Sequence, residues 1–262
     1  MNFDLRLPIF DSLPSARADS QIVIRNSQFG IRNSKIRMSY SPEYFLARER
    51  WRDWRIEARE LVRRARVTQG DAILEIGCGG GGLLRMLAAR GARAVGVDTL
   101  DVALELARTR SKGESPTRLY YDGPSYLARI ADDKPLPFAN ETFDAILAQH
   151  VIEHIAEINA AVREWTRVLK RGGRVALATP NARYPDPAHF ADANHAHIFE
   201  LNELTALLID AGFEIENAVT VFPLLARARA LRAAGVIAHE LFRRVPYFRD
   251  RGRTILIGAR LI

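Results

Sequence analysis

Short apolar runs alternate along this chain with longer segments in which apolar residues recur at helical spacing. The short runs predict buried strands, and the longer segments predict helices with one apolar face. Strands are expected at residues 72–76, 94–98, 143–148, 174–179, 213–222 and 254–261. Helices are expected from about residue 41 onward and at 83–90, 101–110, 157–169 and 202–211. This alternation predicts an α/β fold with a doubly wound parallel sheet.

Two segments between the predicted strands interrupt the regular pattern. Residues 111–124 are polar and contain glycine and proline, so the third strand has two candidate positions, Thr117–Tyr121 and Tyr126–Ala131. We favour the second position. Residues 180–199 form a long loop with several prolines and three histidines, and a loop of this length in a compact α/β domain is usually functional.

Both flanks of the chain differ from the middle. Residues 1–37 lack periodic apolar positions, and Ile24-Arg25-Asn26-Ser27 recurs as Ile31-Arg32-Asn33-Ser34. We expect a disordered, low-complexity extension there. Residues 38–262 are expected to form one domain, in which residues 224–250 are a basic helical insertion or lid before the last strand.

The most unusual stretch directly follows the first predicted strand. Five of the six residues from Gly77 to Gly82 are glycine, and helical spacing begins at Leu83. Glycine accepts a positive φ and has no Cβ, so a ligand can approach the backbone closely. The free N–H groups of the helix's first turn then face that ligand. The second predicted strand ends at Asp98, whose carboxylate is placed to accept both hydroxyls of a ribose.

Taken alone, this stretch fits two classes of nucleotide-binding enzyme. Gly77-x-Gly79-x-x-Gly82 followed by Asp98 satisfies the dinucleotide fingerprint of nicotinamide enzymes. Gly77-x-Gly79-x-Gly81 preceded by Glu75 satisfies the pattern of S-adenosylmethionine (SAM) enzymes equally well. The glycines do not decide between the two classes, so the rest of the chain has to.

Composition narrows the class of protein. The chain is 48% hydrophobic and 26% charged, which is ordinary for a globular domain. It has no apolar run near the ~20 residues of a membrane span, and no apolar segment of a secretory signal. The single cysteine, Cys78, excludes an internal disulfide and a cysteine-built zinc site. We therefore expect a cytoplasmic protein.

The net charge of +7 is unevenly distributed. The basic residues of the chain are concentrated in residues 1–37, 48–66 and 227–253. The remainder of the chain, which includes the glycine-rich stretch, is net acidic. A nucleic-acid partner is therefore disfavoured, and a solvated basic face explains the flanks. The amphipathic basic segment 224–245 fits either a helix packed on the sheet edge or peripheral contact with an anionic membrane.

Motifs in a consistent order separate the two nucleotide-binding classes. They are Glu75-Ile76-Gly77-Cys78-Gly79-Gly80-Gly81, Asp98, Leu136-Pro137-Phe138-x4-Phe143-Asp144, His150-Val151-Ile152-Glu153-His154, Leu169-Lys170-x-Gly172-Gly173 and Thr179-Pro180-Asn181. In order and spacing, the chain resembles the class I SAM-dependent methyltransferases, including ubiquinone-pathway enzymes. The likeness covers about residues 70–215.

This resemblance implies a Rossmann-like, seven-stranded sheet whose last strand is antiparallel. It also implies SAM as the cofactor, with the methionine and ribose portions held by Glu75 and the glycine backbone, and the ribose hydroxyls by Asp98. Asp132 would meet the adenine amino group, with Asp133 as a substitute. The full predicted cofactor set is Glu75, Gly77, Cys78, Gly79, Gly81, Asp98, Thr99, Asp132 and Gln149.

Methyl transfer from a sulfonium is an in-line displacement, so positioning supplies most of the acceleration, and a base is needed only if the acceptor must lose a proton. Ligands of doubly wound sheets lie beyond the carboxyl ends of the strands. That position selects His150 as the first candidate acid/base, followed by His195 and His197 in the long loop. For each, a structural histidine is the alternative.

The segment His150-x-x-Glu153-His154 also raises the question of metal binding. It matches an inverted zinc-protease signature, but its place at a strand-to-helix junction is explained by the methyltransferase pattern. Some ubiquinone-pathway O-methyltransferases carry Glu-x-x-Glu-His here and are metal-assisted, whereas this chain has histidine at the first position. We therefore name no metal ligand, and the sequence does not decide whether the reaction uses a metal.

The residues directly after the fourth predicted strand constrain the acceptor. The sequence Ala148-Gln149-His150-Val151 lacks the Asn/Asp-Pro-Pro-Tyr/Phe motif of enzymes that methylate nucleobase or glutamine nitrogens. A small-molecule or lipid-linked acceptor is therefore expected, with oxygen favoured as the methylated atom and carbon or another nitrogen as alternatives. The alternatives are an RNA methyltransferase, a nicotinamide oxidoreductase and a SAM-binding module without catalysis. The sequence does not predict the oligomeric state.

Overall fold

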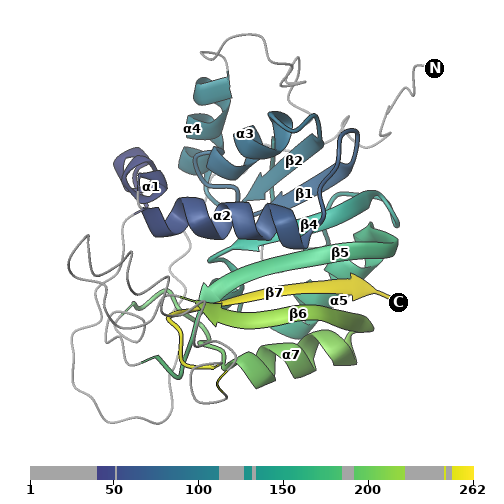
Figure 1. Ribbon diagram of the computed structural model, residues 1–262. Coiled ribbons are helices and arrows are strands. Elements are labelled where there is room, and N and C mark those ends of the chain that lie inside the picture. The colour runs from purple at the N-terminus through teal and green to yellow at the C-terminus, as the bar shows by residue number, and fades with distance from the viewer. Residues whose placement is uncertain are drawn as a thin grey trace. The chain divides into compact units, whose positions relative to one another are not determined.

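A computed structural model describes residues 40–50, 52–111, 127–131, 134–184, 192–221, 245 and 250–262 (Figure 1). The expected extension at residues 1–37 and most of the expected insertion at residues 224–250 lie outside these residues. The same holds for Asp132 and Asp133. The predictions made for these segments therefore stay predictions.

The described strands form one seven-stranded sheet with the order β3-β2-β1-β4-β5-β7-β6. The strands are β1 (Ala72–Ile76), β2 (Arg93–Asp98), β3 (Leu127–Arg129), β4 (Phe143–Gln149), β5 (Leu169–Pro180), β6 (Phe213–Val221) and β7 (Thr254–Leu261). Strands β1 to β5 pair in parallel, whereas β7 runs antiparallel to both of its neighbours. The predicted doubly wound sheet with a reversed last strand is confirmed.

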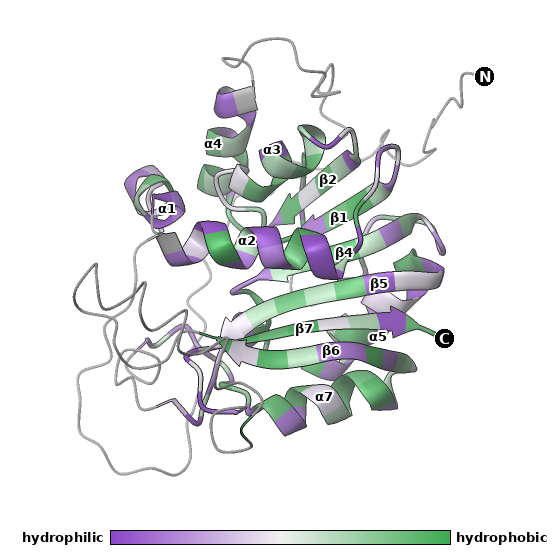
Figure 2. Ribbon diagram, in the orientation of Figure 1, coloured by the Kyte–Doolittle hydropathy of each residue, from purple (hydrophilic) through white to green (hydrophobic). Residues whose placement is uncertain are grey.

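Helices cover both faces of this sheet (Figure 1). They are α1 (Pro42–Glu49), α2 (Arg52–Arg64), α3 (Gly82–Ala88), α4 (Asp101–Ser111), α5 (Ile158–Val168) and α7 (Leu201–Asp210), with a 3₁₀ turn η2 (Ile152–His154). Alternate strand residues divide the core between the two faces: Ala145 and Leu147 pack with α2 and α3, while Ile146 and Ala148 pack with α5 and α7. Figure 2 shows mainly apolar residues along the central strands and a mixture of apolar and polar residues along the helices.

The boundaries differ from the predicted ones in three places. The single helical segment expected from residue 41 is two helices, α1 and α2. The third strand lies in the favoured second position, but only Leu127–Arg129 pair with β2. Strand β5 begins at Leu169, whereas its predicted start was Arg174. A register shift between Phe143 and Ala145 on β4 accommodates the residues of β5 between Leu169 and Arg174.

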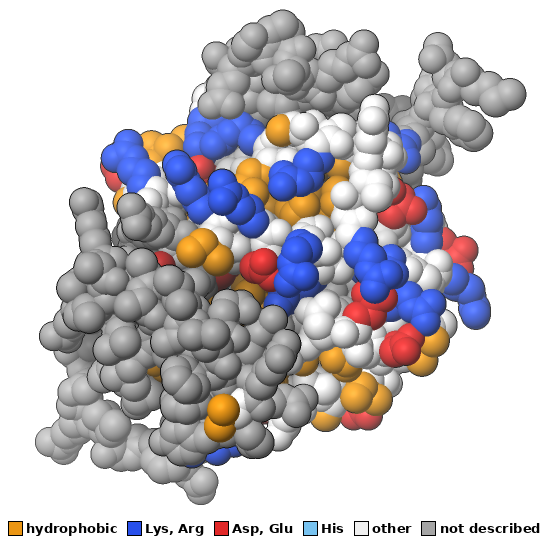
Figure 3. Space-filling model, in the orientation of Figure 1, with side chains coloured by type: hydrophobic (Ala, Val, Ile, Leu, Met, Phe, Trp, Pro, Cys, Tyr) orange, Lys and Arg blue, Asp and Glu red, His pale blue; other side chains and the backbone are white. Residues whose placement is uncertain are grey.

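Helix α2 presents two contrasting faces. Ala58, Leu61 and Val62 are buried against the sheet, whereas Arg55 and Arg59 are exposed. Figure 3 shows Lys and Arg side chains gathered on this side of the molecule. Within the part of the chain that the structure describes, no helix combines the length and apolarity needed to cross a bilayer.

Candidate functional site

A cavity of about 460 Å³ lies at the carboxyl ends of β1, β2 and β4. Its lining comes from α1 and α2, from the glycine turn after β1, from the segment after β4, and from the start of β7. This is the edge at which doubly wound sheets bind ligands. The cavity size lies within the 300–1,000 Å³ typical of small-molecule sites.

The glycine turn forms one wall of the cavity. Gly77 and Cys78 donate their N–H groups to the carbonyl of Val97, at 2.8 and 3.0 Å, which fixes the turn against β2. Gly77 has a φ of +67°, and a Cβ there would lie 2.4 Å from the Val151 side chain. The turn therefore requires glycine at this position both for its backbone angle and for space.

Asp98, at the end of β2, holds the same turn from the other side. Its Oδ2 accepts the N–H of Gly79 at 2.9 Å, and its Oδ1 accepts the N–H of Leu100 at 2.9 Å. The side chain is 7% exposed and lines the cavity. Each carboxylate oxygen has a second lone pair, so Asp98 can hold the turn and still accept hydrogen bonds from a ligand.

Glu75 and Gln149 bring two unmatched acceptor atoms to this cavity. Glu75 Oε2 and Gln149 Oε1 are buried, and neither has a hydrogen-bond partner among the described residues. Burial is the main cause that raises the pKa of Glu75 well above its ordinary value, and the nearby Glu49 and Asp98 carboxylates raise it further. Because buried polar atoms are normally paired, these two require a ligand that donates hydrogen bonds or carries positive charge.

A buried polar cluster around Glu57 of α2 lies at the other side of the cavity. Glu57 Oε2 accepts from Gln149 Nε2 at 3.1 Å and lies 2.9 Å from His150 Nε2. Its Oε1 accepts from the Thr254 hydroxyl at 2.9 Å. Gln149 Nε2 also donates to the carbonyl of Trp54 at 3.1 Å, and these two contacts fix the orientation of the amide.

His150 is held between two carboxylates. Its Nε2 faces Glu57, and its Nδ1 lies 3.3 Å from Glu153 Oε1. Burial is the largest single effect and lowers the pKa of His150, but the Glu57 and Glu153 carboxylates together outweigh it and raise the pKa above the ordinary value. Burial would likewise raise the pKa of Glu57 and Glu153, yet the contacts with His150 lower each to about 2. An imidazolium with both N–H groups donated to carboxylates follows from this arrangement.

His154 and His195 form a second histidine pair in the cavity wall. Their ring centroids are 4.9 Å apart, and His154 Nδ1 lies 3.0 Å from the carbonyl oxygen of Asn194. The ring of Tyr40 meets His154 edge-on at 6.3 Å. Burial raises the pKa of Tyr40 to about 12, so this phenol is neutral near pH 7.

Helix α1 covers the glycine turn. Glu49 at its end is paired with Arg110 of α4, with contacts of 2.6 and 2.7 Å, and with Arg85 of α3 at 3.3 Å. Arg110 also donates to the carbonyl of Gly80 at 2.8 Å. A Cβ on Gly79 would lie 3.0 Å from the Phe45 ring, so the helix approaches the turn closely.

The structure brings most of the predicted site residues together. Those that line the cavity are Glu75, Gly77, Cys78, Gly79, Asp98, Thr99, Gln149, His150 and His195. Gly81 does not line it, because its missing Cβ would face Ala107 at 3.1 Å. His197 is also absent from the lining: its Nε2 pairs with Glu203 at 2.7 Å, and its side chain is 44% exposed.

No residue of α1 or α2 was among the predicted site residues, although both helices line the cavity. Tyr40, Tyr44, Glu49 and Glu57 all line it, although they precede the predicted nucleotide-binding motifs. One signal was present for Glu57. It lies four residues before Leu61 on the face of α2 that is otherwise apolar, and a carboxylate in that position needs a buried partner.

Comparison with known proteins gives consistent results. A family model described as a methyltransferase domain matches residues 74–177. The ubiquinone biosynthesis O-methyltransferase of Mesorhizobium japonicum is 38% identical over 119 residues, which are 45% of this chain and 45% of that protein. The chain thus spans a little under half the length of this curated relative.

Solved structures share the fold. The SAM-dependent methyltransferase of Mesorhizobium loti superposes with a TM-score of 0.58 and 22% identity, over 79% of this chain and 97% of that chain. Phosphoethanolamine N-methyltransferase 2 of Haemonchus contortus, solved in complex with S-adenosyl-L-methionine, gives a TM-score of 0.59 at 17% identity. That match covers 85% of this chain and 57% of the other. At these identities the likeness concerns the fold alone.

Proposed function

We propose that this chain is a class I SAM-dependent methyltransferase and that it transfers a methyl group from SAM to a small-molecule or lipid-linked acceptor, at oxygen. The observation that carries the proposal is the pair of unmatched acceptor atoms, Glu75 Oε2 and Gln149 Oε1, beside the glycine turn. SAM has a sulfonium, an ammonium group and no phosphate. A buried carboxylate suits such a cation and would repel a pyrophosphate.

The cofactor position follows from this wall of the cavity. Glu75 and Gln149 face the cationic end of SAM, and the backbone from Gly77 to Gly79 lies along it. We assign the ribose hydroxyls to the Asp98 carboxylate, which lies at the end of β2 and lines the cavity beside the turn. The assignment of Asp132 to the adenine amino group concerns a residue outside the described part of the chain.

The acceptor then occupies the end of the cavity near Tyr40, His154 and His195. Catalysis is mainly alignment of the acceptor oxygen with the methyl–sulfur bond, because the sulfonium is already an activated donor. His150 lies between these two regions, but both of its nitrogens face carboxylates. We therefore assign His150 a structural role, in which it holds Glu57 and Glu153 in place between the cofactor and the acceptor. Its predicted role as a base stays untested.

The negative charge of the cavity wall favours a small-molecule acceptor over RNA. The carboxylates Glu49, Asp53 and Asp192 line the same cavity, where they would repel a phosphate backbone. One observation favours RNA, namely the exposed arginines of α2 (Figure 3). Methylation of RNA would fall steeply as salt is raised, whereas transfer to a neutral small molecule would not.

Calorimetric titration of the full chain with SAM and S-adenosylhomocysteine tests the cofactor assignment. We expect both to bind, and NADH not to bind. Incubation with methyl-labelled SAM and a metabolite extract, followed by mass spectrometry, then identifies labelled products. Binding of NADH without SAM would overturn the family assignment of the site. Binding of SAM without any labelled product, across extracts from several sources, would favour a module without catalysis.

A further inference from the structure

Asn181 directly follows β5 at the cavity edge of the sheet. It is the last residue of the Thr179-Pro180-Asn181 motif, and its side chain is fully buried. The neighbouring Pro180 lines the cavity, whereas Asn181 is not among the described residues that line it. A buried amide has to be paired with other polar groups, so the role of Asn181 follows from its hydrogen-bond partners.

The Asn181 side chain holds the segment through which the chain re-enters the sheet, residues 250–253 (the re-entry segment). Its Nδ2 donates to the carbonyl oxygens of Asp250 at 2.8 Å and of Gly252 at 2.6 Å, so both amide hydrogens are used. The main-chain N–H of Asn181 adds a bond to the carbonyl oxygen of Arg253 at 2.9 Å. These contacts fix the re-entry segment against the end of β5.

The same residue also holds the end of the loop that carries His195. Asn181 and Phe199 form an isolated parallel bridge, and the N–H of Ala182 donates to the carbonyl oxygen of Phe199 at 2.9 Å. The Asn181 Oδ1 accepts the N–H of Arg183 at 3.1 Å, which fixes the turn that places Ala182 for this bond. The His195 loop and the re-entry segment therefore meet at Asn181.

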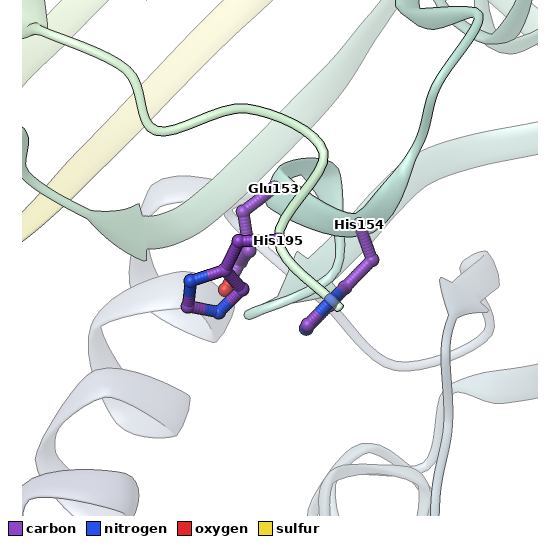
Figure 4. Close-up of side chains that lie close together, drawn as sticks. All are labelled: Glu153, His154 and His195. Atoms are coloured by element: carbon purple, nitrogen blue, oxygen red, sulfur yellow. The ribbon is translucent and has the colours of Figure 1, made fainter. Parts of the chain in front are cut away.

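The His195 loop forms one side of the acceptor end of the cavity. Figure 4 shows His195 of this loop beside Glu153 and His154, which come from η2. The N–H of Ala196 donates to the carbonyl oxygen of Glu153 at 2.8 Å. The loop is therefore attached at two points, and only the second of them, at its end, involves Asn181.

The re-entry segment leads into another side of the acceptor end. Arg253 and Thr254 both line the cavity. The N–H of Gly252 donates to the Thr220 hydroxyl oxygen at 2.8 Å, so the segment is held between β5 and β6. In the sheet, β5 and β7 lie beyond β4, on the opposite side from β1 and β2, whose ends form the cofactor end. Asn181 therefore supports the acceptor end of the cavity.

We propose that Asn181 is a positioning residue for the methyl acceptor, which fixes Arg253 and Thr254 in the cavity wall through the re-entry segment. The proposal rests on the proposed methyl transfer, because that function assigns this wall to the acceptor. Without the Asn181 amide, the carbonyl oxygens of Asp250 and Gly252 lose their donor, and the re-entry segment shifts. The acceptor is then bound less well, whereas SAM at the ends of β1 and β2 is bound as before.

Amide hydrogen exchange of the full chain, measured by mass spectrometry, tests the contacts without any acceptor. We expect Asn181→Ala to speed exchange about tenfold in peptides that cover the re-entry segment, because two buried carbonyl oxygens lose their donor. Exchange in β1 and in the glycine turn should not change. Asn181→Ser is a milder second variant. Its hydroxyl can donate to one carbonyl oxygen, so the increase in the same peptides should be smaller.

Arg183→Ala is the matched control. It lies two residues further along the same turn and removes the pair of the Arg183 guanidinium with the Asp250 carboxylate at 2.6 Å, but it leaves the Asn181 amide in place. Because the Arg183 side chain is 37% exposed, loss of this pair should change exchange much less.

Methylation separates positioning from a merely structural role. Parent and variants are compared with methyl-labelled SAM and serial dilutions of a metabolite extract in which the parent yields a labelled product. Asn181→Ala should need about tenfold more extract for half-maximal rate, because its acceptor wall is displaced. Its KM for SAM, and its SAM affinity by calorimetry, should match those of the parent.

Unchanged exchange in the re-entry segment overturns the proposal. An increase that extends over β1 and the glycine turn, together with weaker SAM binding, also overturns it, because it would mark a general loss of stability. Failure of both the Ala and the Ser variant to fold has the same meaning. A parent chain that binds no SAM contradicts the proposed function instead, and the exchange measurement distinguishes the two failures.

Discussion

Glu75 carries a carboxyl group in an almost fully buried position, and this environment determines its protonation state. Its Oε2 has no partner among the described residues, and burial is the first cause of its raised pKa. A carboxyl group in this state takes up a proton when the cavity is empty. A bound cation would replace that proton, so ligand binding and proton release are coupled at this residue.

Glu75→Gln should stabilise the ligand-free protein, and increasingly so as the pH rises. The folded state holds a proton on Glu75 above the ordinary carboxyl pKa, so folding stability is present at low pH and is lost as pH rises through the raised pKa. In that window the advantage of Gln grows by up to about 1.4 kcal/mol per pH unit. Urea unfolding of both proteins between pH 4 and pH 8 measures it; a difference that is constant with pH would contradict the prediction.

Asp98→Asn should weaken SAM binding by about 1.5–3 kcal/mol, because a neutral amide replaces a charge-assisted acceptor. The amide oxygen can still accept one of the two backbone bonds from Gly79 and Leu100, so the turn should persist. Asp101→Asn is the control, since that carboxylate is 74% exposed. Calorimetry of the three proteins compares the affinities, and unchanged affinity in Asp98→Asn would remove Asp98 from the site.

At the scale of elements, α1 has no buried residue of its own and is held by polar contacts. Its main attachment is the pair formed by Glu49 with Arg110, whose side chains are only 14% and 21% exposed. Because Arg110 also donates to Gly80, the position of α1 is linked to that of the glycine turn. A change in the position of α1 is therefore expected to change the glycine-turn side of the cavity.

A double-mutant cycle of Glu49→Ala and Arg110→Ala should show coupling of about 0.5–3 kcal/mol, the range for residues in contact. We expect each single variant to speed SAM dissociation, measured by stopped-flow displacement, because α1 is released from the turn. Arg108→Ala, which removes a pair with the exposed Glu105, serves as the control and should leave the dissociation rate unchanged. Additive effects in the cycle would mean that the pair does not hold α1.

The elements themselves were largely predictable from sequence, because periodicity and glycine placement are local signals. The strand that ends at Asp98 and the turn at Gly77 depend on adjacent residues, and both lie where expected. The choice between His195 and His197 was not predictable. The two residues are equivalent in an irregular loop, and only the backbone bonds between this loop and Glu153, far earlier in the chain, determine which one faces the cavity.

At the scale of the molecule, Glu57 joins segments that are far apart in sequence. It connects α2 with the end of β4 through Gln149 and His150, and with the start of β7 through Thr254. The Thr254 contact spans 197 residues. The apolar pattern of a single chain carries no signal for such distant pairings, which is why Glu57 was missed although its helix was predicted.

Glu57→Ala should destabilise the protein by about 3–5 kcal/mol, because it leaves the buried His150 facing one carboxylate fewer. Glu57→Gln should cost less, since the amide oxygen still accepts hydrogen bonds. Glu105→Ala removes a salt bridge at the surface and should have little effect. Urea unfolding curves compare the free energies, and equal stability of Glu57→Ala and the parent would show that the cluster is not structural.

The reversed direction of β7 has one more consequence. Because β6 runs toward the cavity edge and β7 runs away from it, the connection between Val221 and Thr254 leaves and re-enters the sheet at that same edge. Arg253 and Thr254, where it re-enters, are already part of the cavity wall. A change in the length of this connection therefore requires no strand of the sheet to pair differently, while the residues at which it re-enters keep their place in the cavity wall.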